Sequence, residues 1–241
     1  MNNVSIMACS IVNRPYYFFD LTSSIDITDK IKLDIISDVV CPWCIVGYKH
    51  LEAAITELGL EDKVEIEWQT FELNPDMSAE GEELRAYVAR KYSSSREDSD
   101  RARANITQQG ADYGFQFNYY DGMIIVNKLD AHVLLELAHK LDLQTQLKLR
   151  LFSAFFTEKK DVSDREVLIT EAESIGINRE QALVELADDR IRQNVKATIN
   201  QWQQMGVSGL PTVVFNRTSA LTGAQPQSTF QKVLLEILAE K

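Results

Sequence analysis

The stretch "DIISDVVCPWCIVGYKHLEAAI", residues 34–55, holds two cysteines two residues apart, where an apolar run gives way to a helical pattern. The run before the pair is rich in β-branched residues and predicts a buried strand. After the pair, Ile45, Tyr48, Leu51 and Ile55 recur every three or four residues, which predicts a helix. A strand therefore leads into a helix, and the cysteine pair lies at the junction.

The two cysteines can form a disulfide at the start of the predicted helix. Pro42 fits the first helical position, because the N–H that proline lacks would have no helical partner there. Residues three apart share a helix face at about 5–6 Å, and a disulfide tolerates Cα separations of about 4.4–6.8 Å. The helix dipole stabilises a thiolate at this end, so we expect a pKa of Cys41 below the ordinary value of about 8.5. Cys41 would then attack a disulfide, and Cys44 would resolve the mixed disulfide.

A metal site and two inert buried thiols are the alternatives for this pair. A metal would need two more ligands, and the chain offers only three histidines and the distant Cys9, with no second C-x-x-C. Two inert thiols would leave Pro42 and Trp43 at a helix start without a reason. We expect a redox pair with no metal and no cofactor beyond its own disulfide, and an apolar rim for substrate formed by Pro42 and Trp43.

Composition favours a cytoplasmic protein with a core of its own. The chain has 241 residues, of which 45% are hydrophobic, and its net charge of −11 disfavours nucleic acid and anionic membrane surfaces as partners. No apolar run approaches the roughly 18 residues that span a bilayer. The first fifteen residues lack the basic segment and cleavage site of a signal peptide. Three cysteines are too few for a disulfide scaffold.

The order of elements predicts an α/β protein with an insertion. Residues 31–77 read as strand, helix and strand, and residues 206–241 as two short strands and a helix. Every period in residues 78–205 is helical. We expect the two ends to form one sheet domain, interrupted by a large all-helical insertion. Residues 1–30 show no sustained period and are expected to be a largely disordered N-terminal extension.

A second signal is "GVSGLPTVVF", residues 206–215, which puts Pro211 directly before a predicted strand. Proline is tolerated there at the first residue of a strand or in a turn. Both a cis bond between Leu210 and Pro211 and an ordinary trans proline fit the position, and only about 5–6% of X–Pro bonds in folded proteins are cis.

Taken together, the strand, the C-x-x-C at a helix start, the helical insertion and G-x-x-G-x-P before a hairpin resemble the DsbA family of thioredoxin-like oxidoreductases. The stretches "SDVVCPWC", "FELNP", "NKLDAH", "LFSAFFTE", "GVSGLPTVVFN" and "LTGAQ" are similar to the FrnE-like branch of that family. The resemblance covers about residues 31–239. It implies a thioredoxin-like sheet domain, a redox pair at Cys41 and Cys44, and a cis-proline at Pro211 packed opposite them.

The resemblance also bears on substrate binding. It implies that the loop with Leu210 and Pro211 offers its backbone to an extended peptide, as in β-augmentation. The branch more usually has valine at position 210, so the leucine leaves the substrate preference open.

Asp38 and His132 are auxiliary candidates. Asp38 lies three residues before Cys41, where we favour a role in capping the turn over proton transfer at the buried sulfur. His132 matches a family histidine that faces the redox site, and a packed helix-terminal histidine is an equal alternative.

We expect a thiol-disulfide oxidoreductase that exchanges disulfides with protein thiols or glutathione, as a monomer or homodimer. Glutathione-dependent transferases of the kappa type and 2-hydroxychromene-2-carboxylate isomerases resemble this layout but carry a serine or similar residue in place of the pair. They are the alternative, and a peptide-binding module without turnover is a third class. The two cysteines favour the first class. Whether the protein oxidises or reduces its partners depends on the reduction potential of the pair, and a difference of about 30 mV changes the equilibrium constant of the exchange tenfold.

Overall fold

The computed structural model describes residues 7–8 and 30–240. A mixed five-stranded sheet runs in the order β1-β7-β6-β2-β3. Its strands are β1 (Met7–Ala8), β2 (Ile31–Ser37), β3 (Val64–Thr70), β6 (Thr212–Phe215) and β7 (Ser219–Thr222). Strands β2 and β3 are parallel, and the other neighbours are antiparallel. Residues from both ends of the chain therefore build one sheet, as the order of elements predicts.

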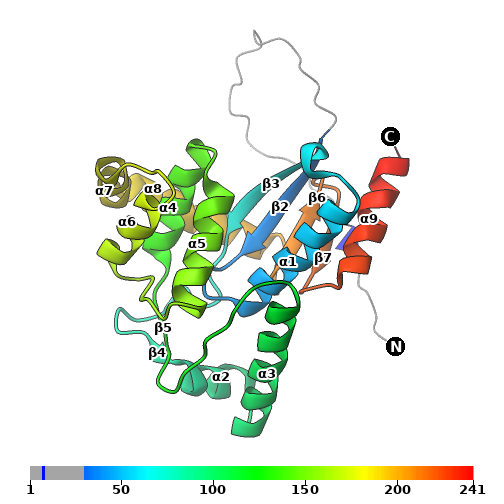
Figure 1. Ribbon diagram of the computed structural model, residues 1–241. Coiled ribbons are helices and arrows are strands. Elements are labelled where there is room, and N and C mark those ends of the chain that lie inside the picture. Colours follow the sequence, from blue (N-terminus) through cyan, green and yellow to red (C-terminus); the bar gives the residue numbers. More distant parts are fainter. Residues whose placement is uncertain (1–6, 9–29, 241) are drawn as a thin grey trace.

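Strand β2 is buried on both faces, which accounts for its nearly continuous apolar sequence. Ile35 faces the main core and pairs with Trp68 of β3. Ile36 faces the opposite side, where it packs with Phe71 and Trp202 in a second cluster. A parallel neighbour requires a crossover, and helix α1 (Pro42–Glu57) makes it from β2 to β3. Helices α1 and α9 (Gln227–Ala239) pack together on one face of the sheet (Figure 1).

The insertion is helical, with one short sheet that the sequence did not predict. Its helices are α2 (Leu84–Tyr92), α3 (Arg96–Asp112), α4 (Leu129–Lys140), α5 (Gln144–Phe156), α6 (Arg165–Glu173), α7 (Arg179–Ala187) and α8 (Asp189–Gln204). Strands β4 (Glu82–Glu83) and β5 (Ile124–Ile125) pair antiparallel within it. Two residues are too few to show the alternation by which a strand is recognised in sequence.

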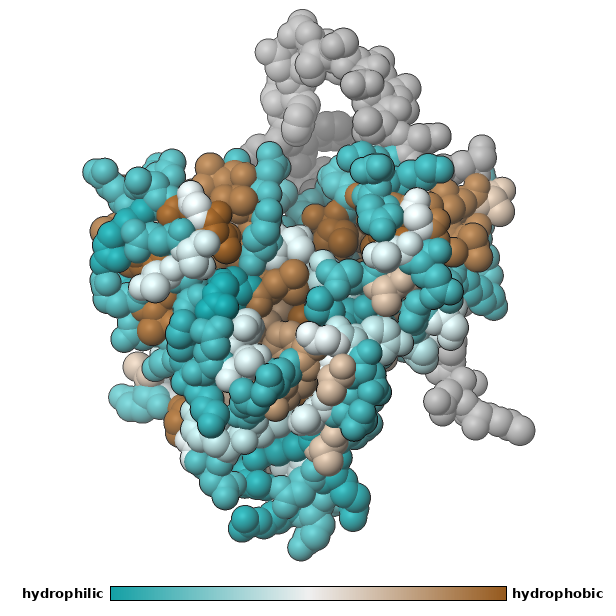
Figure 2. All heavy atoms as spheres, in the orientation of Figure 1, coloured by the Kyte–Doolittle hydropathy of each residue, from teal (hydrophilic) through white to brown (hydrophobic). Residues whose placement is uncertain are grey.

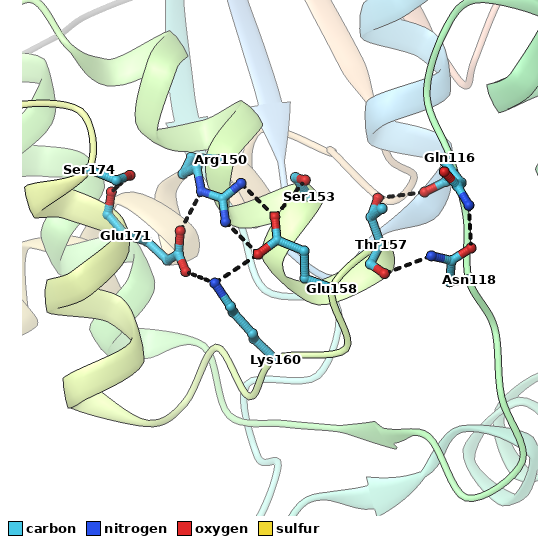
Figure 3. Close-up of polar contacts among 9 residues, drawn as sticks. All are labelled: Gln116, Asn118, Arg150, Ser153, Thr157, Glu158, Lys160, Glu171 and Ser174. Atoms are coloured by element: carbon cyan, nitrogen blue, oxygen red, sulfur yellow. Dashed lines mark hydrogen bonds and ion pairs between the residues drawn. The ribbon is translucent and has the colours of Figure 1, made fainter.

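An ion network fixes the end of α5 to α6 (Figure 3). The carboxylate of Glu171 is buried and accepts hydrogen bonds from Arg150 and from Lys160, the latter at 2.6 Å. Glu158 pairs with the same two cations at 2.6 and 2.7 Å. The network orients α5, the insertion helix that packs against both α1 and β3.

Few residues of the expected N-terminal extension are described. Met7 and Ala8 pair with Ala220 and Ser219 at the edge of the sheet. The prediction for the rest of residues 1–29 lies outside the described residues. Within the described ranges, none of the helices combines the length and the apolar character that a bilayer crossing requires.

Candidate active site

The cysteine pair lies at the beginning of α1, directly after the loop that leaves β2. Cys41 is the N-cap residue with an extended backbone, and Pro42 is the first helical residue. The Cys41 amide donates to the Asp38 carbonyl at 3.2 Å, and the Cys44 amide donates to the Cys41 carbonyl at 3.1 Å. Both thiols are free and buried, with Cys41 4% exposed and Cys44 0% exposed. Cys41 is therefore the sulfur closer to solvent.

The pKa values of the two thiols are shifted in opposite directions. A hydrogen bond with Cys44, together with burial and the charge of Asp38, raises the pKa of Cys41 well above its usual range. Burial also raises the pKa of Cys44, but hydrogen bonds with Cys41 and Ser37 and the charge of Lys148 outweigh it, so the net shift of the Cys44 pKa is downward. These directions favour the anion at Cys44, where Ser37 and Lys148 stabilise it.

The expected low pKa of Cys41 is wrong for this dithiol. A backbone hydrogen bond from Cys44 does lower the Cys41 pKa, in the direction expected at a helix terminus. Its effect is smaller than those of the side-chain hydrogen bond with Cys44 and of burial. The sequence places Cys41 at a helix start but does not show how deeply the insertion buries it.

Asp38 ties the redox loop to two other segments. Its carboxylate accepts hydrogen bonds from the amides of Val40 at 3.2 Å and Leu73 at 2.9 Å. It also forms an ion pair with Lys128 at 3.5 Å, and both side chains are fully buried. Burial raises the Asp38 pKa, but the charge of Lys128 and the hydrogen bonds from the Leu73 and Val40 amides outweigh it, so the net Asp38 pKa is lowered. These contacts are those of a residue that holds the turn.

Lys148 is a buried cation that the sequence analysis did not single out. It is 1% exposed, and within the described part of the chain no carboxylate pairs with it. Its Nζ donates to the Ser37 carbonyl at 3.5 Å and lies 5.4 Å from the ring centre of Trp68 and 5.2 Å from that of Phe152. Burial lowers the pKa of Lys148 to about 8.

A sequence signal for Lys148 exists. Gln144, Leu147, Leu151 and Phe152 form the buried stripe of α5, and Lys148 lies on that stripe. A charged residue at a core position of an amphipathic helix marks a candidate functional site, because buried charges are rare without a partner.

His132 and Glu72 lie near the same buried charges. His132 is fully buried in α4, and burial together with the charge of Lys148 lowers its pKa to about 3, so its ring is neutral. Burial raises the pKa of Glu72 to about 7. The charge of Asp38 acts to raise the pKa of both residues.

Pro211 packs against the same helix as the cysteines. The peptide bond between Leu210 and Pro211 is cis. A Cβ atom added to Gly47 would lie 2.8 Å from Pro211 Cγ, so the loop touches α1 at Gly47. Cys44 and Gly47 are three residues apart and therefore share one face of α1. Leu210 and Trp43 are half-buried against the core, beside Pro211 and Pro42 respectively.

Three residues of the insertion have shifted pKa values. Burial lowers the pKa of Lys91 and raises those of Tyr92 and Tyr119. Sequence reasoning missed these three residues, because the helical period of α2 does not show which face meets another segment. Within the described ranges, three or more His, Cys, Asp or Glu side chains never gather as metal ligands would.

Comparisons with known proteins agree with this architecture. The model of the DSBA-like thioredoxin domain family matches residues 32–235. The uncharacterized protein YwbO of Bacillus subtilis is 24% identical over 213 residues, covering 85% of this chain and 96% of its own. A probable DsbA oxidoreductase from Streptomyces coelicolor superposes with a TM-score of 0.81 at 28% identity, covering 88% of this chain and 91% of its own.

A structure from the alternative class also superposes. A 2-hydroxychromene-2-carboxylate isomerase has a TM-score of 0.65 at 12% identity, covering 87% of this chain and 97% of its own. At that identity the likeness shows a shared fold alone, so the choice between exchange and isomerisation depends on the residues of the site.

Proposed function

Because this chain belongs to the DSBA-like thioredoxin domain family, we propose that it is a thiol-disulfide oxidoreductase with Cys41 and Cys44 as its redox pair. One observation carries the proposal. Two hydrogen-bonded thiols lie at the first turn of one helix, and the same helix touches the Pro211 loop at Gly47. The outer sulfur is the one that a substrate can reach.

The proposed reaction begins at Cys41. Its proton passes to the Cys44 sulfur along their hydrogen bond, and the Cys41 thiolate attacks a substrate disulfide. A Cys41–substrate disulfide forms, and one substrate thiolate leaves and takes up a proton. Cys44 then loses its proton and attacks Cys41, which releases the second substrate thiolate. Two electrons pass to the substrate, and the Cys41–Cys44 disulfide remains; the reverse sequence oxidises a dithiol.

The finer assignment is part of the same proposal. The motifs around Cys41, Pro211 and the "NKLDAH" segment support the FrnE-like branch. We propose protein thiols or glutathione as the exchange partners, with the loop of Leu210 and Pro211, together with Pro42 and Trp43, contacting the substrate. We also propose that the protein is cytoplasmic, that it has no nucleic-acid or membrane partner, and that it is a monomer or homodimer.

The runner-up is a glutathione-dependent transferase or isomerase. The shared fold of the isomerase structure favours it. The second thiol argues against it, because Cys44 lies where it can displace a partner from Cys41 and glutathione conjugation needs no such group.

A variant series tests the proposal. Reduction of insulin disulfides is measured for the wild type, Cys41→Ser, Cys44→Ser and the double variant, and we expect activity in the wild type alone. A mixed disulfide should accumulate in Cys44→Ala and not in Cys41→Ala. A wild type no more active than the double variant refutes the proposal. Glutathione-dependent isomerisation that survives both substitutions establishes the runner-up.

A further inference from the structure

A small cavity of about 110 Å³ lies beside the redox motif. Val40 and Pro42, which flank Cys41 in the sequence, form one wall, and residues of α2, α3 and α5 form the others. The lining is mostly apolar, with Ile106 and Phe156 among its side chains. A volume well below the roughly 300–1,000 Å³ of pockets for whole small molecules suits one substrate side chain.

Arg103 is the cation among the residues that line this cavity. Its Nη2 is buried and has no hydrogen-bond partner among the described residues. Its guanidinium lies over the ring of Tyr119, with Cζ 5.4 Å from the ring centre. A buried donor without a partner is unfavourable, and more so when it is charged, so this group can bind an additional acceptor.

Other arginines near Arg103 form ion pairs with carboxylates on the same surface. Arg101, two residues away on α3, pairs with Asp98 at 2.5 Å. Arg85 pairs with Asp100 at 2.6 Å and with Asp121 at 3.2 Å. In a chain with a net charge of −11, Arg103 nevertheless forms no ion pair with another described residue.

The position of Arg103 connects it to the reacting sulfur. Val40 and Pro42, the residues on either side of Cys41, line the same cavity as Arg103. The Arg103 guanidinium lies over Tyr119, which also lines the cavity. Figure 2 shows apolar side chains gathered between α5 and α1, bordered by hydrophilic residues. An extended substrate held at Cys41 would therefore have a side chain within reach of the cavity and of Arg103.

We propose that this cavity binds a substrate group with an aliphatic stem and a carboxylate close to the reactive sulfur, with Arg103 as its partner. This inference rests on the proposed exchange function and names its substrate class. An arginine fork suits a carboxylate because it can donate two parallel hydrogen bonds. The apolar wall accommodates the stem, and Arg103 binds the charged end.

The test compares matched disulfide peptides with glutamate or glutamine beside the cysteine. For the wild type, kcat/KM should be about tenfold higher with glutamate, since a hydrogen bond to a charged group contributes about 1.5–3 kcal/mol. Arg103→Met should remove the preference, and Arg103→Lys should retain part of it. Arg101→Met is the matched control on the same helix and should keep the full preference. Circular dichroism checks that each variant folds.

A second arm separates the two sources of a carboxylate. The rate of exchange with oxidised glutathione is compared with the rate for its ethyl ester. An Arg103-dependent preference for the free acid over the ester identifies a small thiol as the source. An Arg103-dependent preference among the peptides identifies a peptide, and both preferences together identify both. Equal kcat/KM for glutamate and glutamine, with no ester effect, overturns the inference, as does a preference that survives in Arg103→Met. A wild type that exchanges none of these disulfides overturns the proposed function instead.

Discussion

Lys148 is the residue whose position most needs an explanation at the scale of single side chains. A buried ammonium without a carboxylate is costly, and a well-packed apolar residue at such a site is often as stable or more stable. Lys148 is retained on the apolar stripe of α5. Its charge lowers the pKa of Cys44. The buried lysine therefore reduces stability but favours the thiolate form of the cysteine pair.

Lys148→Met should move the thiolate titration of the pair to higher pH. The substitution removes a positive charge that favours the Cys44 anion, so more hydroxide is needed to form it. Thiolate absorbance near 240 nm, followed against pH in the reduced protein, measures the shift. An unchanged titration would show that the lysine charge does not act on the pair.

The same variant should be more stable at neutral pH. Burial depresses the Lys148 pKa from 10.5 to about 8, so the folded state binds fewer protons than the unfolded state between these values. Wild-type stability therefore rises with pH through this window, and below pH 8 the full penalty is present. Urea unfolding should show Lys148→Met more stable by roughly 3 kcal/mol at pH 7, at about 1.36 kcal/mol per pKa unit, with the difference vanishing towards pH 10.5.

Sequence reasoning at this scale predicted the neighbouring thiols Cys41 and Cys44 and missed their electrostatics. Cys41, Cys44 and Pro211 are marked by local motifs. The pKa of Cys41 depends on its hydrogen bond with Cys44, on burial and on the charge of Asp38. Cys44 and Asp38 are close in sequence, but the depth of burial is set by the tertiary fold, which a local pattern does not contain. Lys128 and Lys148 were also missed, because lysine side chains are usually exposed to water and a local pattern does not show that these two are buried.

At the scale of elements, the contact between α1 and the Pro211 loop sets the site. Gly47 allows this approach, because a Cβ atom there would lie 2.8 Å from Pro211 Cγ and 3.2 Å from Ala224 Cα. Backbone atoms and a proline ring cannot rotate out of the way as a flexible side chain can. A larger residue at position 47 would therefore push the Pro211 loop away from the face of α1 that carries Cys44.

Gly47→Ala should reduce both stability and exchange. Overpacking costs about 1–3 kcal/mol and improved helix propensity returns up to about 1, so we expect a loss of about 1–2 kcal/mol in the free energy of unfolding. Thiol exchange should slow because Pro211 is displaced. Thr56→Ala, on the exposed part of α1, serves as control. A Gly47→Ala protein as stable and active as this control would mean that the contact is not needed.

The network between α5 and α6 is the second element-scale feature. Arg150→Met leaves the buried Glu171 with Lys160 as its remaining cation. We expect a loss of about 1–3 kcal/mol by urea unfolding, as for a buried charged group that loses one partner. Arg179→Met removes exposed pairs with Glu166 and Glu173 and should change stability by less than about 0.5 kcal/mol. Similar losses in the two variants would contradict the buried network.

Element boundaries illustrate which signals a sequence contains. The apolar run before the cysteine pair and the helical period after it correspond to β2 and α1. The ribbon of β4 and β5 was not predicted, because each strand is stabilised by pairing with a residue about forty positions away and not by its own pattern.

At the scale of the whole molecule, the order of elements was enough to predict the sheet domain and its insertion. Parallel pairing of β2 with β3 follows from the βαβ unit, and antiparallel pairing of β6 with β2 brings the two ends of the chain together. The sequence did not show how the insertion meets the sheet domain. That junction creates the cavity at Pro42 and the burial of both cysteines.

The fold does not decide the function. The oxidoreductase and isomerase structures both superpose on more than four fifths of the chain. The proposed exchange depends on the two thiols at the start of α1, and reversible oxidation of that pair is the central claim.

A redox titration tests this claim most directly. The Cys9→Ser protein is equilibrated in glutathione buffers of stepped ratio, its free thiols are alkylated, and intact mass counts them. We predict that Cys41 and Cys44 become protected together, in a single two-electron transition that is absent in Cys44→Ser. Two cysteines that stay alkylatable at every ratio, or that react with glutathione independently of each other, would contradict the account.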